Sequence, residues 1–407
     1  MQRAADNMRV LIAAMVERAK SGHPGGSMGG ADFANVLYSS YLVYDPEDPT
    51  WIARDRFFLD PGHMSPMLYS VLALSGKYTL DELKDFRQWG SHAPGHPELN
   101  PLRGVENSSG PLGQGHVMAV GAAIGERFIA QRFGEEWAHK TYAFISDGGI
   151  QEEISQGAGR IAGTLGLNNL IMFYDANDVQ LSTRVEEVTS EDTAAKYRAW
   201  NWHVIEIDGN DPVQIARAIE EACAQKEKPT LIIGHTVMAK GVVKPDGSSL
   251  EGAVSTHGQP LSAAGADVAA TIAGLGGNPD DPFEIWDDVA AIYERRRLEL
   301  MEIVAERKAA QMRWAEANPA DAELLQNYIE GKMPEINWDA IEYKAGLASR
   351  NASSIVLGVL AEKLGNMIVS SADLANSDKT DGFLKKTHAI AAGDFSGRFL
   401  QAGVAEL

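Results

Sequence analysis

The apolar residues between positions 141 and 236 fall in short runs that are separated by longer amphipathic stretches. The runs are rich in β-branched and aromatic residues and predict buried strands at residues 141–146, 170–174, 204–207 and 231–234. The stretch after the first run, residues 151–165, predicts a helix. Strands that alternate with helices favour an α/β fold with a doubly wound parallel sheet and right-handed crossovers.

The first 20 residues carry apolar side chains at helical spacing, namely Met8, Leu11, Ile12, Met15 and Val16. This pattern predicts an amphipathic helix, and Asp6 near its start and Arg18 near its end suit the helix dipole. A secretory signal would have a basic start and an unbroken apolar centre, so we expect a cytoplasmic protein. Residues 21–120 are rich in Gly, Pro and His and predict helices joined by long, functional loops.

The second half of the chain changes character twice. Residues 262–341 are dense in Asp and Glu, and residues 284–317 have a strongly helical composition, which predicts an acidic, solvated helical connector. A second α/β pattern follows, with a helix expected at 347–364 and strands at 367–370 and 398–404. We therefore predict a first domain over 1–261, a connector over 262–341 and the start of a second domain over 342–407. Two strands leave a sheet edge and an apolar face uncovered, so this second domain should be incomplete.

Composition removes several classes of function. The chain has 407 residues, of which 44% are apolar and 23% charged, with a net charge of −20. No apolar run approaches the roughly 18 residues of a membrane-spanning helix, and the acidic excess disfavours nucleic acid and anionic membranes as partners. The single cysteine, Cys223, excludes intramolecular disulfides and cysteine-based zinc sites.

Polar side chains follow two neighbouring predicted strands. Asp147, Gly148 and Gly149 come directly after the strand at 141–146, and Asn177 follows the next one. The ends of adjacent parallel strands lie on one edge of a sheet, where a carboxylate and an amide would suit Mg²⁺ or Ca²⁺ together with phosphate oxygens. The glycines would let a phosphate approach a helix N-terminus. Alternatively, Asp147 is a helix N-cap and Asn177 a turn residue.

Histidines recur in turns that are rich in glycine and proline, at His23, His63, His96, His116 and His257. Imidazoles gathered from such loops could bind a diphosphate and move protons near neutral pH. The role of His116 stays open. The remaining histidines are interpreted as structural or surface residues: His92, His139, His203, His235 and His388.

Nine motifs then occur in order between positions 6 and 406: SGHPGGSMGGAD, DPGHMSPMLYS, APGHPE, SSGPLGQG, SDGGIQEEISQGAG, NLIMFYDAND, VSTHGQPL, SSADLANS and AGVAE. Together they closely resemble transketolase, the thiamine-diphosphate-dependent transferase of the pentose phosphate pathway. The resemblance implies reversible transfer of a two-carbon ketol group from a ketose phosphate to an aldose phosphate. It also implies a homodimer in which the diphosphate-binding domain of one subunit and the pyrimidine-binding domain of the other enclose thiamine diphosphate and Mg²⁺, with Ca²⁺ as an alternative.

The resemblance also assigns roles in the first domain. Asp147, Asn177 and the Val179 carbonyl match the metal ligands. The residues that match contacts to the cofactor are His63, His257, Gly148, Gly110 and Leu112. Those that match the sugar channel are His23, His96 and His257. Glu152 matches the carboxylate that links to the activating glutamate of the other subunit.

Four further matches lie in the predicted second domain. Glu406 matches the activating glutamate, which would favour the imino tautomer of the cofactor pyrimidine; taken alone, it would be an ordinary acid at a helix start. Arg350 and Ser377 match residues that bind the sugar phosphate, and Asp373 matches an acid that faces the cofactor. A guanidinium suits phosphate because its fork donates two hydrogen bonds.

The resemblance stops where the family would continue through an aromatic pyrimidine pocket and a C-terminal domain. We therefore expect a fragment of a longer transketolase, with little or no activity by itself. Two alternatives stay open. One is a non-catalytic module or subunit that binds thiamine diphosphate and needs a partner chain. The other is a related enzyme such as dihydroxyacetone synthase, although His23, His96, Arg350 and Ser377 together favour transketolase.

Overall fold

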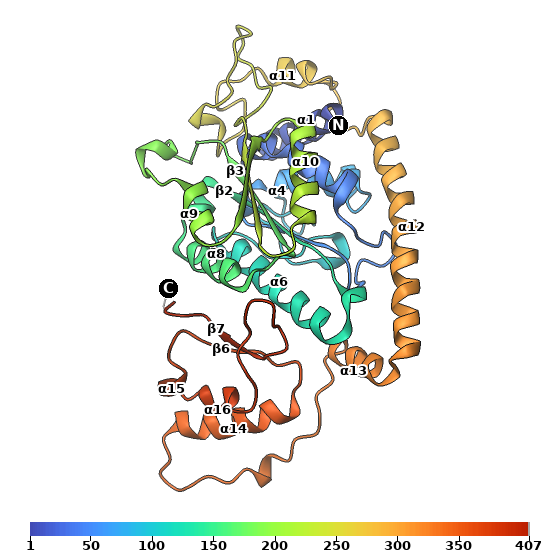
Figure 1. The fold of residues 1–407 in the computed structure, drawn as a ribbon. Helices are drawn as coiled ribbons and strands as arrows, with labels where there is room; N and C mark the ends of the chain where they lie inside the picture. Colours follow the sequence, from blue (N-terminus) through green and yellow to red (C-terminus); the bar gives the residue numbers. More distant parts are fainter. Residues whose placement is uncertain (406–407) are drawn as a thin grey trace.

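A computed structural model describes residues 1–405 of the chain (Figure 1). Its centre is a five-stranded sheet in the order β1-β2-β3-β5-β4, and every neighbouring pair is parallel. The strands are β1 (Arg56–Leu59), β2 (Thr141–Ser146), β3 (Leu170–Ala176), β4 (His203–Asp208) and β5 (Thr230–His235). The predicted α/β class and parallel sheet are confirmed, as are the four strands expected between residues 141 and 236.

The edge strand β1 was not predicted. It lies within residues 21–120, where we expected helices and loops, and it pairs with β2 from Arg56 opposite Thr141 to Leu59 opposite Phe144. Four residues are too few to display a periodicity of their own. The strand can therefore be identified only from its pairing with β2.

Helices cover the sheet and extend beyond it. Those of the first 280 residues are α1 (Gln2–Ala19), α2 (Pro24–Gly29), α3 (Ala31–Val36), α4 (Ser65–Leu74), α5 (Leu80–Lys84), α6 (Gln114–Phe133), α7 (Asp147–Gln151), α8 (Glu153–Leu165), α9 (Thr193–Ala199), α10 (Pro212–Ala224) and α11 (Val268–Gly274). Those that follow are α12 (Asp287–Ala317), α13 (Pro319–Ile329), α14 (Ser349–Lys363), α15 (Ala375–Asp378) and α16 (Asp381–Leu384). None of the described helices is long and apolar enough to cross a membrane.

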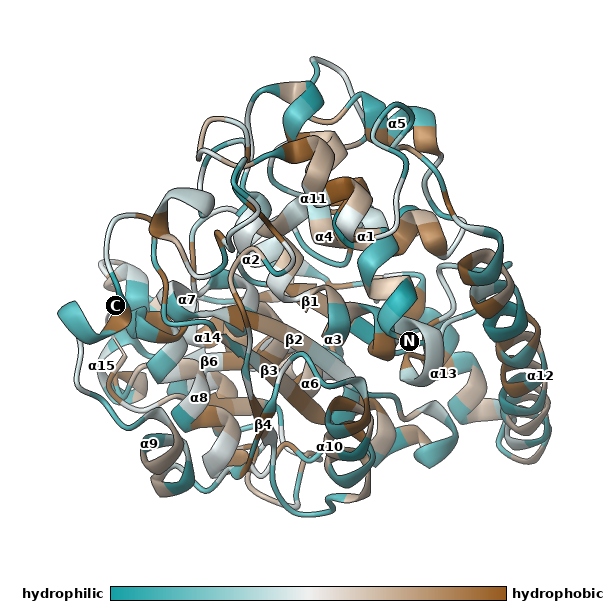
Figure 2. Cartoon of the chain, turned by 90° about the horizontal axis from the view of Figure 1, so that it is seen from above, coloured by the Kyte–Doolittle hydropathy of each residue, from teal (hydrophilic) through white to brown (hydrophobic). Residues whose placement is uncertain are grey.

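The two faces of the sheet belong to two apolar clusters, because successive side chains of a strand point to opposite faces. On β3, Ile171 and Phe173 join the cluster beneath α1, α3 and α10, whereas Met172 joins the cluster beneath α6 and α8. Phe33 of α3 stacks on Phe173 with 4.0 Å between ring centroids. Figure 2 shows this apolar sheet with helices around it.

The helix predicted over residues 151–165 is in fact two helices. α7 begins directly after β2 and ends at Gln151, and Glu152 then adopts an extended conformation before α8 begins at Glu153. The side chain of Ser146 accepts a hydrogen bond from the Gly149 backbone and caps α7. The interpretation of Asp147 as an N-cap is therefore wrong, since the preceding residue has that role.

The acidic region is dominated by α12, which runs along the side of the first domain in Figure 1. We expected a solvated connector, but one face of this helix is buried against the N-terminal region. Leu300 and Val304 pack with Trp51, and the Tyr293 hydroxyl donates to Asn35 Oδ1 at 3.0 Å. α12 has 31 residues, and its apolar face therefore packs against the domain that precedes it.

The C-terminal part contains α14 and a separate parallel pair, β6 (Val369–Ser371) and β7 (Phe399–Gln401). Ala361, Phe383 and Phe399 form its small apolar cluster. The strand predicted over 398–404 ends at Gln401, and two residues later Gly403 has a φ of +72°. Arg132 of α6 holds this part against the first domain by donating to the Phe395 carbonyl at 2.7 Å.

Candidate functional site

The ends of β2 and β3 bring Asp147 and Asn177 together. Ser146 lies opposite Asp175 in the parallel register, so the residues that follow each strand emerge at the same edge of the sheet. The Asn177 backbone N–H donates to Asp147 Oδ2 at 3.2 Å, although the two residues are 30 positions apart in the chain. The strand register thus places a carboxylate and an amide side by side.

Asp147 is a buried acid whose pKa is raised above its ordinary value. Its carboxylate accepts the Tyr174 hydroxyl at 2.6 Å. Burial raises the pKa of Asp147 to about 7, and the neighbouring Asp175 adds to the increase. A divalent cation next to this carboxylate would offset the cost of its charge.

Asp175 and Asn177 form the other half of this edge. The Asn177 amide donates to Asp175 Oδ2 at 2.9 Å, and the Val179 backbone N–H donates to Asn177 Oδ1 at 3.0 Å. Burial raises the pKa of Asp175 to about 6. Asp178, between Asn177 and Val179, has a φ of +62°, which turns the chain sharply at this position. Sequence analysis missed Tyr174 and Asp175, although both belong to the NLIMFYDAND motif.

Three imidazoles gather opposite this edge. The ring centroids of His23 and His63 are 5.0 Å apart, those of His63 and His257 are 5.3 Å apart, and those of His23 and His257 are 5.9 Å apart. They come from the start of α2, the turn after β1 and the segment after residue 256. We call this group the histidine cluster.

The histidine cluster is held in its neutral form. Burial, followed by the charges of His257, Arg87 and His96, lowers the pKa of His23 to about 4. Burial also lowers the pKa values of His63 and His257. The Nδ1 atoms of His23 and His257 are buried and have no hydrogen-bond partner among the described residues.

One cavity of about 300 Å³ joins the histidine cluster to the sheet edge. Its lining includes Asp147, Asn177, Val179, Gly148 and Leu112, together with the three imidazoles. No group of three or more His, Cys, Asp or Glu residues in the described part of the chain could hold a metal by itself. A hard cation here would take further oxygens from the backbone, water or a bound phosphate, as Mg²⁺ commonly does. The donor set therefore fits a metal–diphosphate group.

Asp60 is a buried acid that holds a loop of the site, and sequence analysis missed it. It follows β1, is fully buried and accepts the backbone N–H groups of Gly113 and His116 at 3.1 and 3.2 Å. Burial raises its pKa to about 6. The acid ties the loop that carries Gly110 and Leu112 to the sheet. Its position directly after the apolar run RFFL was the available signal.

Four other candidate residues of the first domain do not line the 300 Å³ cavity. His96 lies outside the 300 Å³ cavity and lines a larger pocket beside it. Glu152 lies at the break between α7 and α8 and is half-buried. Gly110 is half-buried in the loop before α6. His116 is fully buried, and burial lowers its pKa to about 3, so it is a core residue.

Two of the C-terminal predictions lie together, away from the cavity. Arg350 of α14 donates to the Ser377 carbonyl at 3.2 Å, and both residues are exposed. Asp373 is exposed and has a φ of +67°. None of the three lines the cavity of the histidine cluster. Glu406 lies outside the described residues.

The buried imidazoles make stability dependent on pH. A histidine with a lowered pKa takes up a proton at a higher pH in the unfolded chain than in the folded chain. The stability that its neutral form contributes is therefore present above pH 6.5 and is lost as the pH falls towards about 4. We expect the free energy of unfolding in urea to fall over this window, with a shallower fall in His23→Gln. His388→Gln, at an exposed position, should keep the steep dependence. Equal slopes in all three proteins would contradict the burial argument.

Comparisons with known proteins identify the family of the chain. A family model described as "Transketolase, thiamine diphosphate binding domain" matches residues 1–334, so that part of the chain is a thiamine-diphosphate-binding domain. The transketolase of Halalkalibacterium halodurans is 37% identical over 415 residues, which cover all of this chain and 61% of the relative. The chain therefore belongs to the transketolase family, and it spans about 61% of the length of this relative.

Solved structures give the same result. Transketolase from Leishmania mexicana superposes with a TM-score of 0.92 at 33% identity, covering 99% of this chain and 60% of that one. Transketolase from Pichia stipitis in complex with sedoheptulose 7-phosphate superposes with a TM-score of 0.91 at 34% identity and the same coverage. The fold described above is thus the N-terminal part of the transketolase fold.

Proposed function

We propose that the chain binds thiamine diphosphate through Mg²⁺ in the cavity of the histidine cluster and forms part of a transketolase. The observation that carries this proposal is the meeting of Asp147 and Asn177 at adjacent strand ends, opposite three neutral imidazoles. Such a site offers oxygen ligands to a hard cation on one side and hydrogen-bonding nitrogens to phosphate oxygens on the other.

Asp147, Asn177 and the Val179 carbonyl hold the metal in this proposal, with Ca²⁺ as a possible substitute. The diphosphate lies against Gly148, His63 and His257, and Gly110 and Leu112 contact the cofactor rings. A Cβ at Gly148 would lie 2.8 Å from Leu112 Cδ1, so a side chain there would crowd the cofactor-binding loop. When bound, the cofactor supplies the carbon nucleophile that carries a two-carbon ketol group.

His23, His96 and His257 then move protons to and from sugar hydroxyl groups. The lowered pKa values keep His23 and His257 neutral near pH 7, so each ring keeps a nitrogen that can accept a hydrogen bond from a sugar hydroxyl group. Glu406 activates the cofactor of a second subunit, with Glu152 as its carboxylate partner in a homodimer. Asp373 faces the cofactor from the pyrimidine-binding side. The proposal also divides the chain into a diphosphate-binding domain over 1–261, a connector over 262–341 and the start of the pyrimidine-binding domain over 342–407.

Sugar phosphates are the proposed substrates. The Pichia stipitis structure was solved with sedoheptulose 7-phosphate, which is a ketose phosphate. Arg350 and Ser377 lie together on the surface of the C-terminal part, where a guanidinium is available to a phosphate. Because they are remote from the histidine cluster of their own chain, we propose that they serve a site completed by a second subunit.

Calorimetry with thiamine diphosphate and Mg²⁺ tests the proposal. We expect about one cofactor bound per chain, and loss of binding when EDTA removes the metal. A coupled assay with a ketose phosphate and an aldose phosphate then separates a transferase from a module that binds without turnover. Metal-independent binding, or no binding, would contradict the proposed site.

A further inference from the structure

Asp60 is a buried acid that does not itself line the cavity of the histidine cluster. It directly follows β1, and its backbone N–H donates to the Phe144 carbonyl at 3.0 Å, which continues the pairing of β1 with β2. Burial raises the pKa of its carboxyl group to about 6, so the anion costs free energy at neutral pH. Only the hydrogen bonds that the carboxylate accepts offset this cost.

These hydrogen bonds hold the start of α6. Asp60 Oδ2 accepts the Gly113 backbone N–H at 3.1 Å, and Oδ1 accepts the His116 backbone N–H at 3.2 Å. The N-cap residue of α6 is Gly113, which has no side chain to cap the helix. An acid from another element therefore caps α6, at the end where the helix dipole favours a negative charge. A Cβ at Gly115 would lie 2.5 Å from Asp60 Cα, so the helix start also packs directly on the end of β1.

The segment over residues 107–113, which we call the glycine loop, leads into α6 and is held by further polar contacts. No apolar side chain of this segment is buried. The Asn107 side chain accepts the Leu59 backbone N–H at 3.2 Å and donates to the Leu59 carbonyl at 3.1 Å. The Ser109 hydroxyl donates to the Asp60 carbonyl at 2.6 Å. Hydrogen bonds to the end of β1, and not buried apolar side chains, therefore fix the glycine loop.

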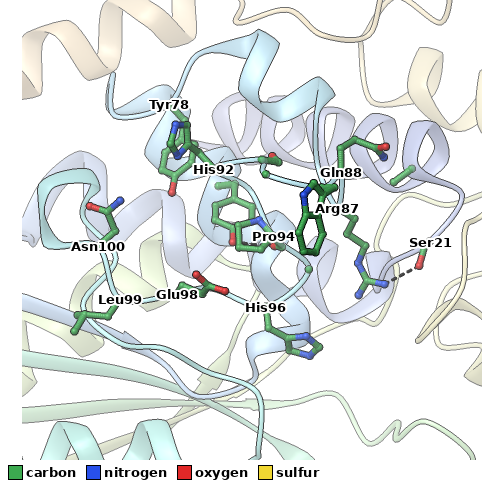
Figure 3. Close-up of a pocket in the computed structure, with 16 residues that line it drawn as sticks. Ser21, Tyr78, Arg87, Gln88, His92, Pro94, His96, Glu98, Leu99 and Asn100 are labelled. Carbon is green, nitrogen blue, oxygen red and sulfur yellow. Dashed lines mark hydrogen bonds between the residues drawn. The ribbon is translucent and has the colours of Figure 1, made fainter.

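The segment that flanks the glycine loop borders open space. The Ser109 backbone N–H donates to the Pro97 carbonyl at 3.0 Å, which joins the glycine loop to residues 94–100. Those residues line a pocket of about 1010 Å³, and Figure 3 shows His96 and Glu98 at its wall. Packing from this side therefore contributes little to the position of the glycine loop.

The contacts of Asp60 reach three parts of the cavity wall. His63 lies three residues after Asp60, in the turn that follows β1. Leu112 directly precedes the N-cap residue of α6, whose N–H the carboxylate accepts. Gly148 directly precedes Gly149, where a Cβ would collide with Asp60 Oδ2. Because the residues reached in this way all line the cavity, one buried side chain sets their relative positions.

We propose that Asp60 is a positioning residue for thiamine diphosphate, which holds Gly110 and Leu112 against the cofactor rings by anchoring the glycine loop to β1. This inference rests on the proposed function and deepens it, because it separates the group that positions the ring contacts from the groups that hold the metal. The hydrogen bonds of Asp60 act on the glycine loop, whereas its contact with Gly149 depends only on its shape. Loss of the charge should therefore weaken the ring contacts and spare the metal–diphosphate contacts.

Calorimetry on the full chain with two ligands tests this division of roles. Asp60→Asn keeps the size of the side chain, but its NH₂ group meets one of the two backbone N–H groups, so a hydrogen bond is lost. We expect the affinity for thiamine diphosphate with Mg²⁺ to fall about tenfold or more. Inorganic pyrophosphate with Mg²⁺ lacks the rings and should bind the variant within about twofold of the unmodified chain. An equal loss for both ligands, or no loss for thiamine diphosphate, would overturn the inference.

Asp55 provides the matched control at the opposite end of β1. It is also buried, burial raises its pKa, and its side chain accepts the Val43 and Lys140 backbone N–H groups at 2.9 and 2.8 Å. Asp55→Asn therefore makes the same chemical change in a similar environment that is not part of the cavity wall. Both ligands should bind this variant as they bind the unmodified chain. A matching loss of thiamine diphosphate affinity in Asp55→Asn would assign the effect to the removal of any buried acid and overturn the inference.

Ser109→Ala keeps the test decisive if Asp60→Asn does not fold. It removes only the hydroxyl group that donates to the Asp60 carbonyl and leaves the carboxylate in place. Thiamine diphosphate should bind this variant a few-fold more weakly and pyrophosphate should bind it normally, whereas normal binding of both would contradict the role of these hydrogen bonds. Failure of the unmodified chain to bind either ligand would instead contradict the proposed function, so the two failures give different results.

Discussion

Replacing Asp147 by asparagine should abolish the Mg²⁺-dependent binding of thiamine diphosphate. The variant keeps the shape of the side chain and an oxygen for the Tyr174 hydroxyl, but it removes the charge that a metal needs. We expect the affinity for the cofactor to fall by more than about 100-fold in calorimetry with Mg²⁺. Asp246→Asn, at an exposed loop position, should bind as the unmodified chain does.

The same variant should not lose stability in the absence of ligand. Burial raises the pKa of Asp147 to about 7, so its protonated form is favoured in the folded chain. The stability that this group contributes is present below its unfolded pKa and is lost as the pH rises through about 7. The asparagine variant has no charge to bury and should unfold at an equal or higher urea concentration at mildly alkaline pH. A variant that is both unstable and unable to bind would point to a structural role for Asp147 instead.

Gly163→Ala should destabilise the first domain more than any of the other substitutions considered above. A Cβ at this position of α8 would lie 1.7 Å from the Trp200 carbonyl oxygen and 3.0 Å from Trp202 Cδ1. The Trp202 indole N–H also donates to the Gly159 carbonyl at 2.7 Å, so the helix cannot move away without losing that bond. Overpacking of this kind costs about 3 kcal/mol of unfolding free energy or more.

Gly157→Ala is the matched control in the same helix. A Cβ at Gly157 has no neighbour within 4 Å, and alanine stabilises a helix interior relative to glycine by about 1 kcal/mol. Urea unfolding should therefore shift in opposite directions for the two variants. Similar shifts for both would show that α8 does not pack against Trp200 as described.

Much of the sheet could be predicted because its inner strands carry their own signal. β2 and β3 are buried along their whole length and contain the apolar runs YAFI and LIMFY, which is typical of a parallel sheet that is covered on both faces. The edge strand β1 has only four residues and depends on its neighbour. The break at Glu152 was missed for a similar reason, since the helical composition continues across it while the backbone does not.

The residues of the candidate site likewise fall into those that the sequence predicted and those that it missed. Asp147 and Asn177 could be predicted as neighbours because strand ends of a parallel sheet lie on one edge. Asp60, Tyr174 and Asp175 were missed because their importance comes from hydrogen bonds to residues that are distant in the chain: Gly113 for Asp60, Asp147 for Tyr174 and Thr236 for Asp175. The correction for His116 is of the same kind, since its flanking glycines resemble those of the histidine cluster but its side chain is fully buried.

By itself, the sequence determined the α/β class, the strand ends that carry polar residues and the resemblance to transketolases, because apolar periodicity and motif order are local properties of the chain. The tertiary structure decided which side chains share a cavity. It placed His23, His63 and His257 together, put His96 in a larger neighbouring pocket that Arg87 also lines, and left the Arg87 guanidinium without a carboxylate partner among the described residues. These outcomes depend on how loops that are distant in sequence meet above the sheet and on which charges burial leaves unpaired. No spacing along the chain encodes either property.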